Sequence, residues 1–323
     1  LIEDFKQSNE KYIKFYNDRR LPFEDMKVNE FSDLTRAYVK IQDGCNNYCA
    51  YCIIPYVRGS IRSKGFDEAV NEIKTLVDKG HKEIVFTGIN TGAYGKETGK
   101  YDLTDLIREI SKIDRLERIR VSSIEITEID DKFIEEMRVN PKLCAHLHVS
   151  LQSGSERILQ IMNRKYTKAE YLEKINKLKT ARPEINLTTD VIVGFPTETE
   201  EEFLECVEYC KEVGFSKIHV FPYSKREGTK AASMDGHLPN NIKKDRARRL
   251  IEIDNDLQLQ YNNKFIGTKV NVLIEEIVDG KSIGHTQNFL KVIVDQELDT
   301  NTCYDVMITA ADIECVYGKK GEK

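Results

Sequence analysis

Three cysteines that lie close together are the residues in this sequence best suited to chemistry. Cys45, Cys49 and Cys52 follow Gly44 at a Cys-x3-Cys-x2-Cys spacing. Three thiolates on one short loop can bind three irons of a cubane iron–sulfur cluster, which leaves the fourth iron open to a ligand that reacts. Four cysteines would close that position. The count of three therefore favours a reactive cluster over a structural one.

Two other interpretations of these cysteines remain open. A structural zinc ion takes four Cys or His ligands, and the nearest further candidate along the chain is His81. A disulfide would leave the third thiol unpaired, and disulfide frameworks are typical of short secreted chains. The chain has eight cysteines in 323 residues and no recognisable signal-peptide pattern, so we expect a reducing, cytoplasmic location.

The composition limits the classes of partner. Charged residues make up 32% of the chain, and no apolar run approaches the roughly 18 residues of a membrane span. The formal net charge of -5 gives no global nucleic-acid signature, so RNA contacts must come from local clusters. Basic residues gather after the cysteines, at Arg58 and Arg62, and in a later helical segment, at Lys243, Lys244 and Arg246. Such runs bind phosphates or simply form a solvated face.

The cysteine loop follows the first of several strand-like runs that alternate with helical patterns. Apolar and β-branched runs occupy 38–42, 83–87, 118–122, 145–151, 185–193 and 217–221, and amphipathic helical stretches separate them. Six strand–helix repeats predict an α/β fold in which crossover helices join parallel strands. In such folds the active groups gather where the strands end.

The region after residue 263 has a different character. Short strand-like runs at 269–275, 282–285, 289–294 and 305–309 lie between Gly and Asp turns, a pattern typical of a small all-β barrel. The polar segment at the start of the chain resembles a connector. We therefore expect a linker over 1–36, an α/β domain over 37–262 and a β-barrel over 263–323.

Polar and glycine residues follow several of the predicted strands. They include Thr87, Gly88, Glu125, Gln152 and Tyr223. Because the carboxyl ends of parallel strands meet at one edge, we expect these residues to line one rim beside the cysteine loop and to form a ligand site.

The fourth predicted strand carries His146, His148, Ser150 and Gln152 on one face, which would point into the lumen of a barrel. We expect both histidines to be structural, because the sequence identifies no partner for metal binding or proton transfer. Arg164, just beyond, could pair with a ligand carboxylate. The other cysteines are interpreted as structural residues, with Cys206 and Cys210 as small buried residues of one amphipathic helix. They are Cys144, Cys206, Cys210, Cys303 and Cys315.

Several strings of residues resemble a known family. The motif of Cys45, Cys49 and Cys52 is similar to the signature of the radical S-adenosylmethionine superfamily, and residues 40–45 and 52–59 resemble its methylthiotransferases. The strings at 146–155, 164–167, 190–196 and 221–228 resemble the same family, most closely the branch that modifies threonylcarbamoyladenosine in bacterial tRNA. Residues 267–312 look like the small RNA-binding TRAM barrel that ends these enzymes.

The resemblance implies a partial (β/α)6 barrel followed by a TRAM-like barrel. It implies a 4Fe-4S cluster on the three cysteines, whose open iron binds S-adenosylmethionine, and a deoxyadenosyl radical that takes hydrogen from C2 of a modified adenosine before a methylthio group is installed there. tRNA and a flavodoxin-type electron donor are the implied partners. The residues that would line the cofactor or substrate are Tyr51, Thr87, Gly88, Glu125, Gln152, Arg164, Asp190 and Tyr223.

The resemblance also implies a missing part. Members of this family carry an upstream domain in which three more cysteines hold a second 4Fe-4S cluster, and residues 1–36 contain no cysteine. We therefore expect this chain to lack that domain and to cleave the cofactor without completing sulfur insertion. Other members act on isopentenyladenosine in tRNA or on an aspartate of a ribosomal protein, and both targets remain open. A non-catalytic RNA-binding protein with a zinc site remains open as well.

Overall fold

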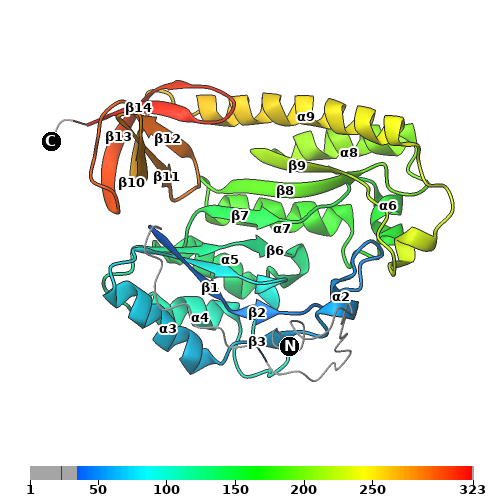
Figure 1. The fold of residues 1–323 in the computed structure, drawn as a ribbon, viewed down its shortest axis with the longest axis horizontal. Helices are drawn as coiled ribbons and strands as arrows, with labels where there is room; N and C mark the ends of the chain where they lie inside the picture. Colours follow the sequence, from blue (N-terminus) through cyan, green and yellow to red (C-terminus); the bar gives the residue numbers. More distant parts are fainter. Residues whose placement is uncertain (1–22, 24–34, 322–323) are drawn as a thin grey trace, which may run out of the picture.

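The structure is a computed structural model that describes residue 23 and residues 35–321. The predicted linker over residues 1–36 therefore lies largely outside the described residues. From the first strand onward the chain forms an α/β region and then a small β-barrel (Figure 1).

Parallel strands form the centre of the α/β region, as the sequence predicted. β1 pairs with β4 and β4 with β5, while β6, β7, β8 and β9 pair in that order, and all of these pairs are parallel. β5 corresponds to the predicted strand over 118–122, and β6 follows it after one residue, so the two sheets continue into each other as a partial barrel. The strands are β1 (Arg36–Lys40), β4 (Glu83–Thr87), β5 (Arg118–Val121), β6 (Ser123–Ile124), β7 (His146–Val149), β8 (Asn186–Val193) and β9 (Lys217–Pro222).

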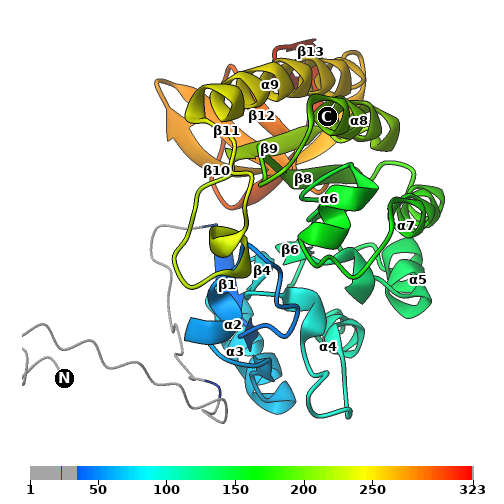
Figure 2. The same ribbon diagram turned by 90° about the vertical axis from the view of Figure 1, so that its right-hand side faces the viewer.

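Helices cover the outer face of these sheets (Figure 2). Their apolar stripes pack on the outward-facing strand residues, so that Ile73, Leu106, Ile84 and Phe86 share one buried cluster. Thr199 caps one of these helices in a reciprocal capping box, as predicted. The helices are α3 (Phe66–Asp78), α4 (Leu103–Ile110), α5 (Asp131–Val139), α6 (Glu156–Ile161), α7 (Lys168–Ala181), α8 (Glu200–Val213) and α9 (Asn240–Asn263).

Short elements frame the cysteine loop. β2 (Gln42–Asp43) pairs antiparallel with β3 (Arg62–Ser63), and α2 (Ile54–Val57) follows the last cysteine. The predicted strand over 38–42 is thus split, because Gln42 and Asp43 turn away to pair with the returning chain. α3 begins at Phe66 after Gly65, so Asp67 lies in the first turn of this helix.

A closed barrel follows α9, with its strands in the order β10-β11-β12-β14-β13. Its interior is filled by alternating apolar residues, among them Val272, Val292, Val306 and Ile308. The sequence did not predict the last strand, because glycine and lysine interrupt its alternation. The strands are β10 (Lys269–Val278), β11 (Lys281–Thr286), β12 (Lys291–Val294), β13 (Thr302–Ala311) and β14 (Val316–Lys320).

The small barrel packs against the amino ends of the α/β strands through the loop over 285–289. Arg118 donates to the His285 oxygen over 2.8 Å, and Arg120 donates to the oxygens of Thr286 and Gln287 over 3.3 and 3.2 Å. The next oxygen in this loop accepts from the Asn186 side chain over 2.7 Å. Four successive backbone oxygens of the loop are therefore bound by the α/β region, which satisfies groups that would otherwise be buried without partners.

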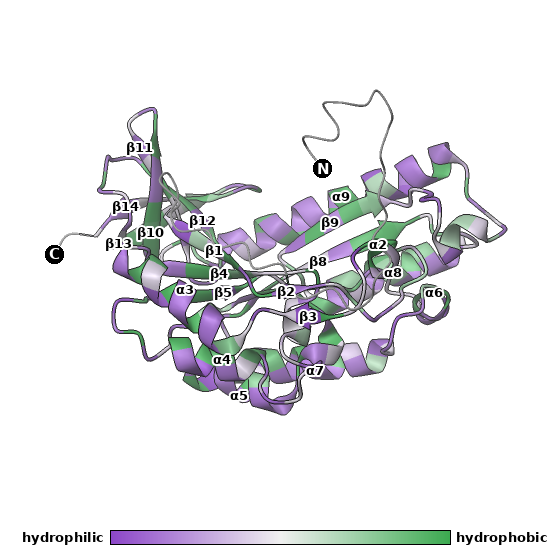
Figure 3. Ribbon diagram, turned by 60° about the horizontal axis from the view of Figure 1, so that its bottom comes forward, coloured by the Kyte–Doolittle hydropathy of each residue, from purple (hydrophilic) through white to green (hydrophobic). Residues whose placement is uncertain are grey.

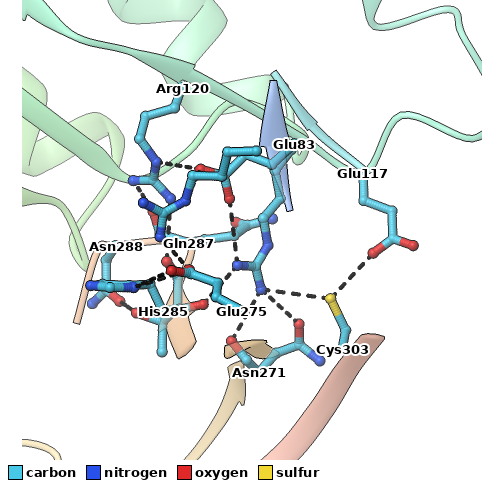
Figure 4. Close-up of polar contacts among 12 residues, drawn as sticks. Glu83, Glu117, Arg120, Asn271, Glu275, His285, Gln287, Asn288 and Cys303 are labelled. Atoms are coloured by element: carbon cyan, nitrogen blue, oxygen red, sulfur yellow. Dashed lines mark hydrogen bonds and ion pairs between the residues drawn. The ribbon is translucent and has the colours of Figure 1, made fainter. Parts of the chain in front are cut away.

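A buried carboxylate organises the same interface. Glu83 is fully buried and forms an ion pair with Arg120 over 2.7 Å and with Arg36 over 3.2 Å. Arg36 reaches across to Glu275 of the small barrel, which also contacts His285 (Figure 4). Burial opposes ionisation of Glu83, but the neighbouring arginines outweigh it and lower the pKa of its carboxyl.

No helix among the described residues combines the length and the apolar character that a membrane span requires. Figure 3 shows hydrophilic residues distributed along the outer helices, including α4, α5 and α9.

Candidate active site

The three cysteines lie on a loop between β2 and α2, which Gly44 allows to turn sharply. Gly44 has a φ of +70°, and a Cβ atom there would lie 2.0 Å from the backbone oxygen of Ser60. The Cys45 amide donates to the Gly59 oxygen over 3.1 Å, and the Cys52 amide donates to the Cys49 oxygen over 3.0 Å. The loop therefore curls so that all three thiols come from one short turn, and only glycine fits at its start.

Segments that are distant in sequence hold the loop in place. The Ala50 amide donates to the Met162 oxygen over 2.9 Å, and the Ala231 amide donates to the Ala50 oxygen over 2.7 Å. The Asn163 side chain donates to the Tyr48 oxygen over 2.8 Å. A buried apolar cluster packs beneath these contacts, which means that the loop takes its position only in the folded barrel. The cluster consists of Ala50, Ile158, Met162, Phe195, Tyr223 and Ala231.

Asp43 precedes the loop and gathers three basic side chains. Its carboxylate accepts hydrogen bonds from Lys40 and Arg58, each over 2.8 Å, from Arg62 over 3.1 Å and from the Gly44 amide over 2.8 Å. Burial raises the pKa of this carboxyl, but the hydrogen bonds from Lys40 and Arg58 outweigh burial and lower it overall. Arg58 and Arg62, two of the proposed RNA contacts, therefore also brace the cysteine loop.

Gln42 is a site residue that the sequence reasoning missed. It is fully buried, and its Nε2 donates to the oxygens of Asp43 and Gly44 over 2.8 and 2.7 Å, while its Oε1 accepts from the Asn90 amide over 2.7 Å. Gly88 packs against it so closely that a Cβ at Gly88 would lie 3.1 Å from the Gln42 Cβ. Gln42 thus ties the cysteine loop to the end of β4. Its only signal in the sequence was a polar residue at the end of an alternating run.

The three thiols are free and half-buried. Burial raises the pKa of Cys45 to about 11, with repulsion from Cys49 and Glu125 adding to it, and burial raises the pKa of Cys52 as well. Thiolates are the form that binds metal. A positively charged centre is therefore what would hold these sulfurs in their ionised form.

The chemistry of the donor set fits a cluster of several irons. Among residues 35–321, no three Cys, His, Asp or Glu side chains are placed to share one metal ion. A cubane differs, because each thiolate binds a separate iron. The remaining cysteines lie elsewhere, as predicted for structural residues. Cys206, for example, accepts from the Gly154 amide over 3.0 Å within the barrel wall.

A buried arginine connects the cysteine loop to the strand ends. The Arg164 guanidinium donates to the Cys49 Sγ over 3.4 Å and to the Tyr51 hydroxyl over 3.3 Å, and it forms an ion pair with Glu125. Its side chain is only 3% exposed. Burial raises the pKa of Tyr51, so its hydroxyl stays protonated. The structure thus brings together Cys49, Tyr51, Glu125 and Arg164, all of which the sequence singled out.

The other predicted rim residues lie around this group. Gln152 has a φ of +67°, and its amide donates to the Asp190 oxygen over 2.8 Å. Thr87 ends β4, and its oxygen accepts from the Ile41 amide over 3.0 Å. Tyr223 is buried with its ring 5.2 Å from that of Phe195. These positions at the carboxyl ends of the strands are those that a ligand beside the cysteines would contact.

The basic residues of α9 are placed less uniformly than the sequence suggested. Arg246 is buried and pairs with Glu198 over 2.6 Å, so its charge is used inside the protein and it is no longer a candidate RNA contact. Lys243 donates to the Tyr223 oxygen over 3.1 Å. Lys244 is exposed and keeps its place as a candidate.

A cavity of about 350 Å³ lies at the opposite end of the strands from the cysteines. Its walls come from the starts of β7, β8 and β9, from the end of α9 and from the small barrel. Four histidines line it together with Phe289 of the barrel loop. The histidines are His146, His148, His219 and His285.

Comparison with known proteins agrees with this architecture. Residues 39–216 match the Radical SAM superfamily. The coproporphyrinogen III oxidase HemN of Escherichia coli, a radical SAM enzyme, superposes with a TM-score of 0.51 at 16% identity over 70% of this chain and 54% of its own. The radical S-adenosylmethionine methyltransferase TsrM of Kitasatospora setae gives 0.51 at 16% identity over 60% and 38%. Both support the fold alone.

Closer relatives are found by sequence. The threonylcarbamoyladenosine tRNA methylthiotransferases MtaB of Bacillus subtilis and Thermotoga maritima are 42% and 37% identical over 87% and 90% of this chain. The tRNA-2-methylthio-N(6)-dimethylallyladenosine synthase of Acetivibrio thermocellus is 44% identical over 77% of it. The chain spans 66%, 67% and 52% of these three relatives respectively. It belongs to the radical SAM superfamily and, within it, to the methylthiotransferase family.

Proposed function

We propose that this chain is the radical S-adenosylmethionine part of an enzyme that installs a methylthio group at C2 of threonylcarbamoyladenosine next to the anticodon of tRNA. The loop of three half-buried thiols beside Arg164 supports the proposal most directly. The relatives named for this reaction on tRNA support it further. We assign the supply of sulfur to the part of those relatives that this chain does not span.

Cys45, Cys49 and Cys52 would hold a 4Fe-4S cluster. When bound, the cluster supplies the electron that cleaves S-adenosylmethionine to methionine and a deoxyadenosyl radical, with a flavodoxin-type protein as the external reductant. The chain itself holds the thiolates and orients the ligand. The Tyr51 hydroxyl and the Arg164 guanidinium offer donors at the strand ends, and the apolar cluster beneath the loop excludes water.

The polarity of the barrel lumen favours the threonylcarbamoyl group over an isopentenyl group. Strand register places His148 beside Thr188 and Thr188 beside Lys217, and in the next layer it places Asp190 beside His219. A threonylcarbamoyl group carries a carboxylate, a hydroxyl and amides that can pair with such side chains. An isopentenyl group offers no hydrogen bond to the remaining acceptor sites of Asp190 and would remove them from water, which is costly. The 44% identity to the dimethylallyladenosine synthase keeps isopentenyladenosine as the second candidate.

Cofactor cleavage tests the chemistry. The chain, reconstituted anaerobically with iron and sulfide, should turn brown and should form deoxyadenosine from S-adenosylmethionine and dithionite. A colourless protein that forms no deoxyadenosine would instead favour the non-catalytic RNA-binding alternative.

Nucleoside analysis tests the substrate. Mass spectrometry of tRNA from a deletion strain should reveal loss of 2-methylthio-threonylcarbamoyladenosine with the isopentenyl derivative retained. Loss of the isopentenyl derivative, or loss of the modification from a ribosomal protein alone, would contradict the assignment.

A further inference from the structure

We propose that His148 is a positioning residue that fixes the Asp190 carboxylate as a hydrogen-bond acceptor in the barrel lumen, with Thr188 and His146 continuing the chain of hydrogen bonds behind His148. The proposal depends on the proposed function only for the identity of the ligand. That ligand would carry hydroxyl or N–H donors on a ribose or base, as S-adenosylmethionine and a tRNA nucleoside both do.

A continuous chain of polar contacts runs through the lumen from Asp190 to His146, which lies at the amino end of β7. The His148 Nε2 lies 3.3 Å from the Asp190 Oδ2, and the His148 Nδ1 lies 3.1 Å from the Thr188 Oγ1. The same hydroxyl oxygen lies 3.2 Å from the His146 Nε2. The His146 Nδ1 is buried and has no hydrogen-bond partner among the described residues.

The positions of the hydrogens follow from this order. An ionised Asp190 only accepts, so the His148 Nε2 carries a proton and donates it. In the neutral ring, the His148 Nδ1 has a lone pair and accepts a hydrogen bond from the Thr188 hydroxyl. The single hydrogen of that hydroxyl is thereby used. The hydroxyl oxygen must in turn accept from the His146 Nε2. The His146 Nδ1 is left without a proton, and a bare buried lone pair costs less than a buried N–H with no acceptor.

The surroundings keep His146 neutral, as this order requires. Its ring stacks on Phe289 with centroids 4.8 Å apart, and the Arg120 Cζ lies 4.7 Å from the centroid of the same Phe289 ring. Burial, followed by repulsion from Arg120, lowers the pKa of His146 well below its usual value. The Arg120 guanidinium itself donates a hydrogen bond to Glu83 at the start of β4 (Figure 4).

The groups that face His148 come from four strands. His146 shares its strand, Thr188 and Asp190 come from β8, and His219 of β9 has its ring 5.6 Å away. Ser123 of β6 is its neighbour on the other side by register. None of these except Asp190 is an anion, so Asp190 is the group that His148 orients.

Asp190 keeps capacity for a ligand after this contact. Its side chain is 30% exposed, whereas most of the lumen around it is buried. A carboxylate has about four lone-pair sites, and His148 uses one of them. The remaining sites are acceptors, which selects hydroxyl and N–H donors and disfavours anionic groups at this point of the lumen.

Nitrogen NMR of the 323-residue chain labelled with ¹⁵N-histidine tests the chain of contacts without a cluster. At pH 8 the His148 ring should show the Nε2–H tautomer alone. Asp190→Ala should release the His148 ring into tautomer exchange, and Asp190→Glu, which keeps a carboxylate, should restore the single tautomer. A proton on the His148 Nδ1, or no change in Asp190→Ala, would overturn the proposal.

Kinetics then identify the ligand. His148→Gln and Asp190→Asn should raise the KM for one partner about tenfold with kcat less affected, as expected for the loss of one hydrogen bond to a charged group. A raised KM for S-adenosylmethionine in the cleavage assay assigns Asp190 to the cofactor, and weaker tRNA binding assigns it to the nucleoside. Unchanged values for both would refute the role of Asp190. A chain that fails to form deoxyadenosine at all, yet shows the predicted tautomers, would contradict the proposed function alone.

Discussion

Arg164 donates a hydrogen bond to the sulfur of Cys49 over 3.4 Å while the same guanidinium is paired with Glu125. One side chain therefore joins a proposed cluster ligand to the residue that follows β6. Hydrogen bonds and positive charge at a ligand sulfur raise the reduction potential of an iron–sulfur cluster. This relationship makes Arg164 the residue through which the barrel wall would influence the cluster.

Replacing Arg164 tests this influence. Arg164→Met should lower the reduction potential of the reconstituted cluster and should destabilise the fold by about 3 kcal/mol, because Glu125 is left without its buried partner. Redox titration and urea unfolding measure the two effects. Arg138→Met is the control, since Arg138 pairs with Glu135 at the surface and such pairs contribute little. Equal unfolding midpoints for the two variants would contradict the structural role of Arg164.

The choice of cysteines can be tested with a matched pair. Cys49→Ala should abolish the brown colour, the bound iron and the formation of deoxyadenosine, because only two thiolates then remain on the loop. Cys210→Ala removes a sulfur buried in α8 and should leave all three unchanged. Iron analysis after anaerobic reconstitution measures the difference. Full iron content in Cys49→Ala would refute the assignment of the cluster.

Gly44 offers a test of the shape of the loop. Gly44→Ala combines a φ of +70° with a Cβ only 2.0 Å from the Ser60 oxygen, so the loop should open and iron binding should be lost. Gly99→Ala has a similar φ of +64° but no atom within 4 Å of the new Cβ. It should cost only about 1 kcal/mol and should leave iron binding intact. If both variants bind iron equally, the close packing at Gly44 is not required.

The buried His146 predicts how stability changes with pH. Its pKa is lowered by burial, so the folded protein keeps it neutral while the unfolded chain takes up a proton below about pH 6.5. Stability should therefore fall as the pH drops from 6.5 to 5, by about 2 kcal/mol from this residue. His146→Phe keeps a ring against Phe289 and should flatten this part of the curve. Urea unfolding across that range measures it, and an unchanged slope would contradict the prediction.

Much of the framework was predictable because it depends on local patterns. Alternating and helical periodicity located the parallel strands, and β4 and α8 have the bounds that the sequence suggested. The three-cysteine spacing is itself local, as is the capping box at Thr199. The interruption between β5 and β6 was not predicted, because Ser122 looks like one more strand residue.

The contacts that complete the site could not be read from sequence. Gln42 contacts Gly88 and Asn90, which lie more than forty residues away along the chain. No local sequence pattern predicts these contacts. The burial of Arg246 could not be predicted either, because it depends on the ion pair with Glu198, a residue that is distant in sequence. Both histidines of β7 also looked purely structural, since Thr188 and Asp190 reach them only across the sheet.

The four backbone oxygens of the loop over 285–288 have a consequence for folding. Their partners are Arg118, Arg120 and Asn186, so separating the two regions would remove a donor from each of these oxygens at once, although the Thr286 oxygen would keep a second donor, the Phe289 amide. Local opening of such an interface is nearly as costly as opening the barrel wall itself. The small barrel and the α/β region should therefore exchange their core amide hydrogens at closely similar rates and melt as one cooperative unit.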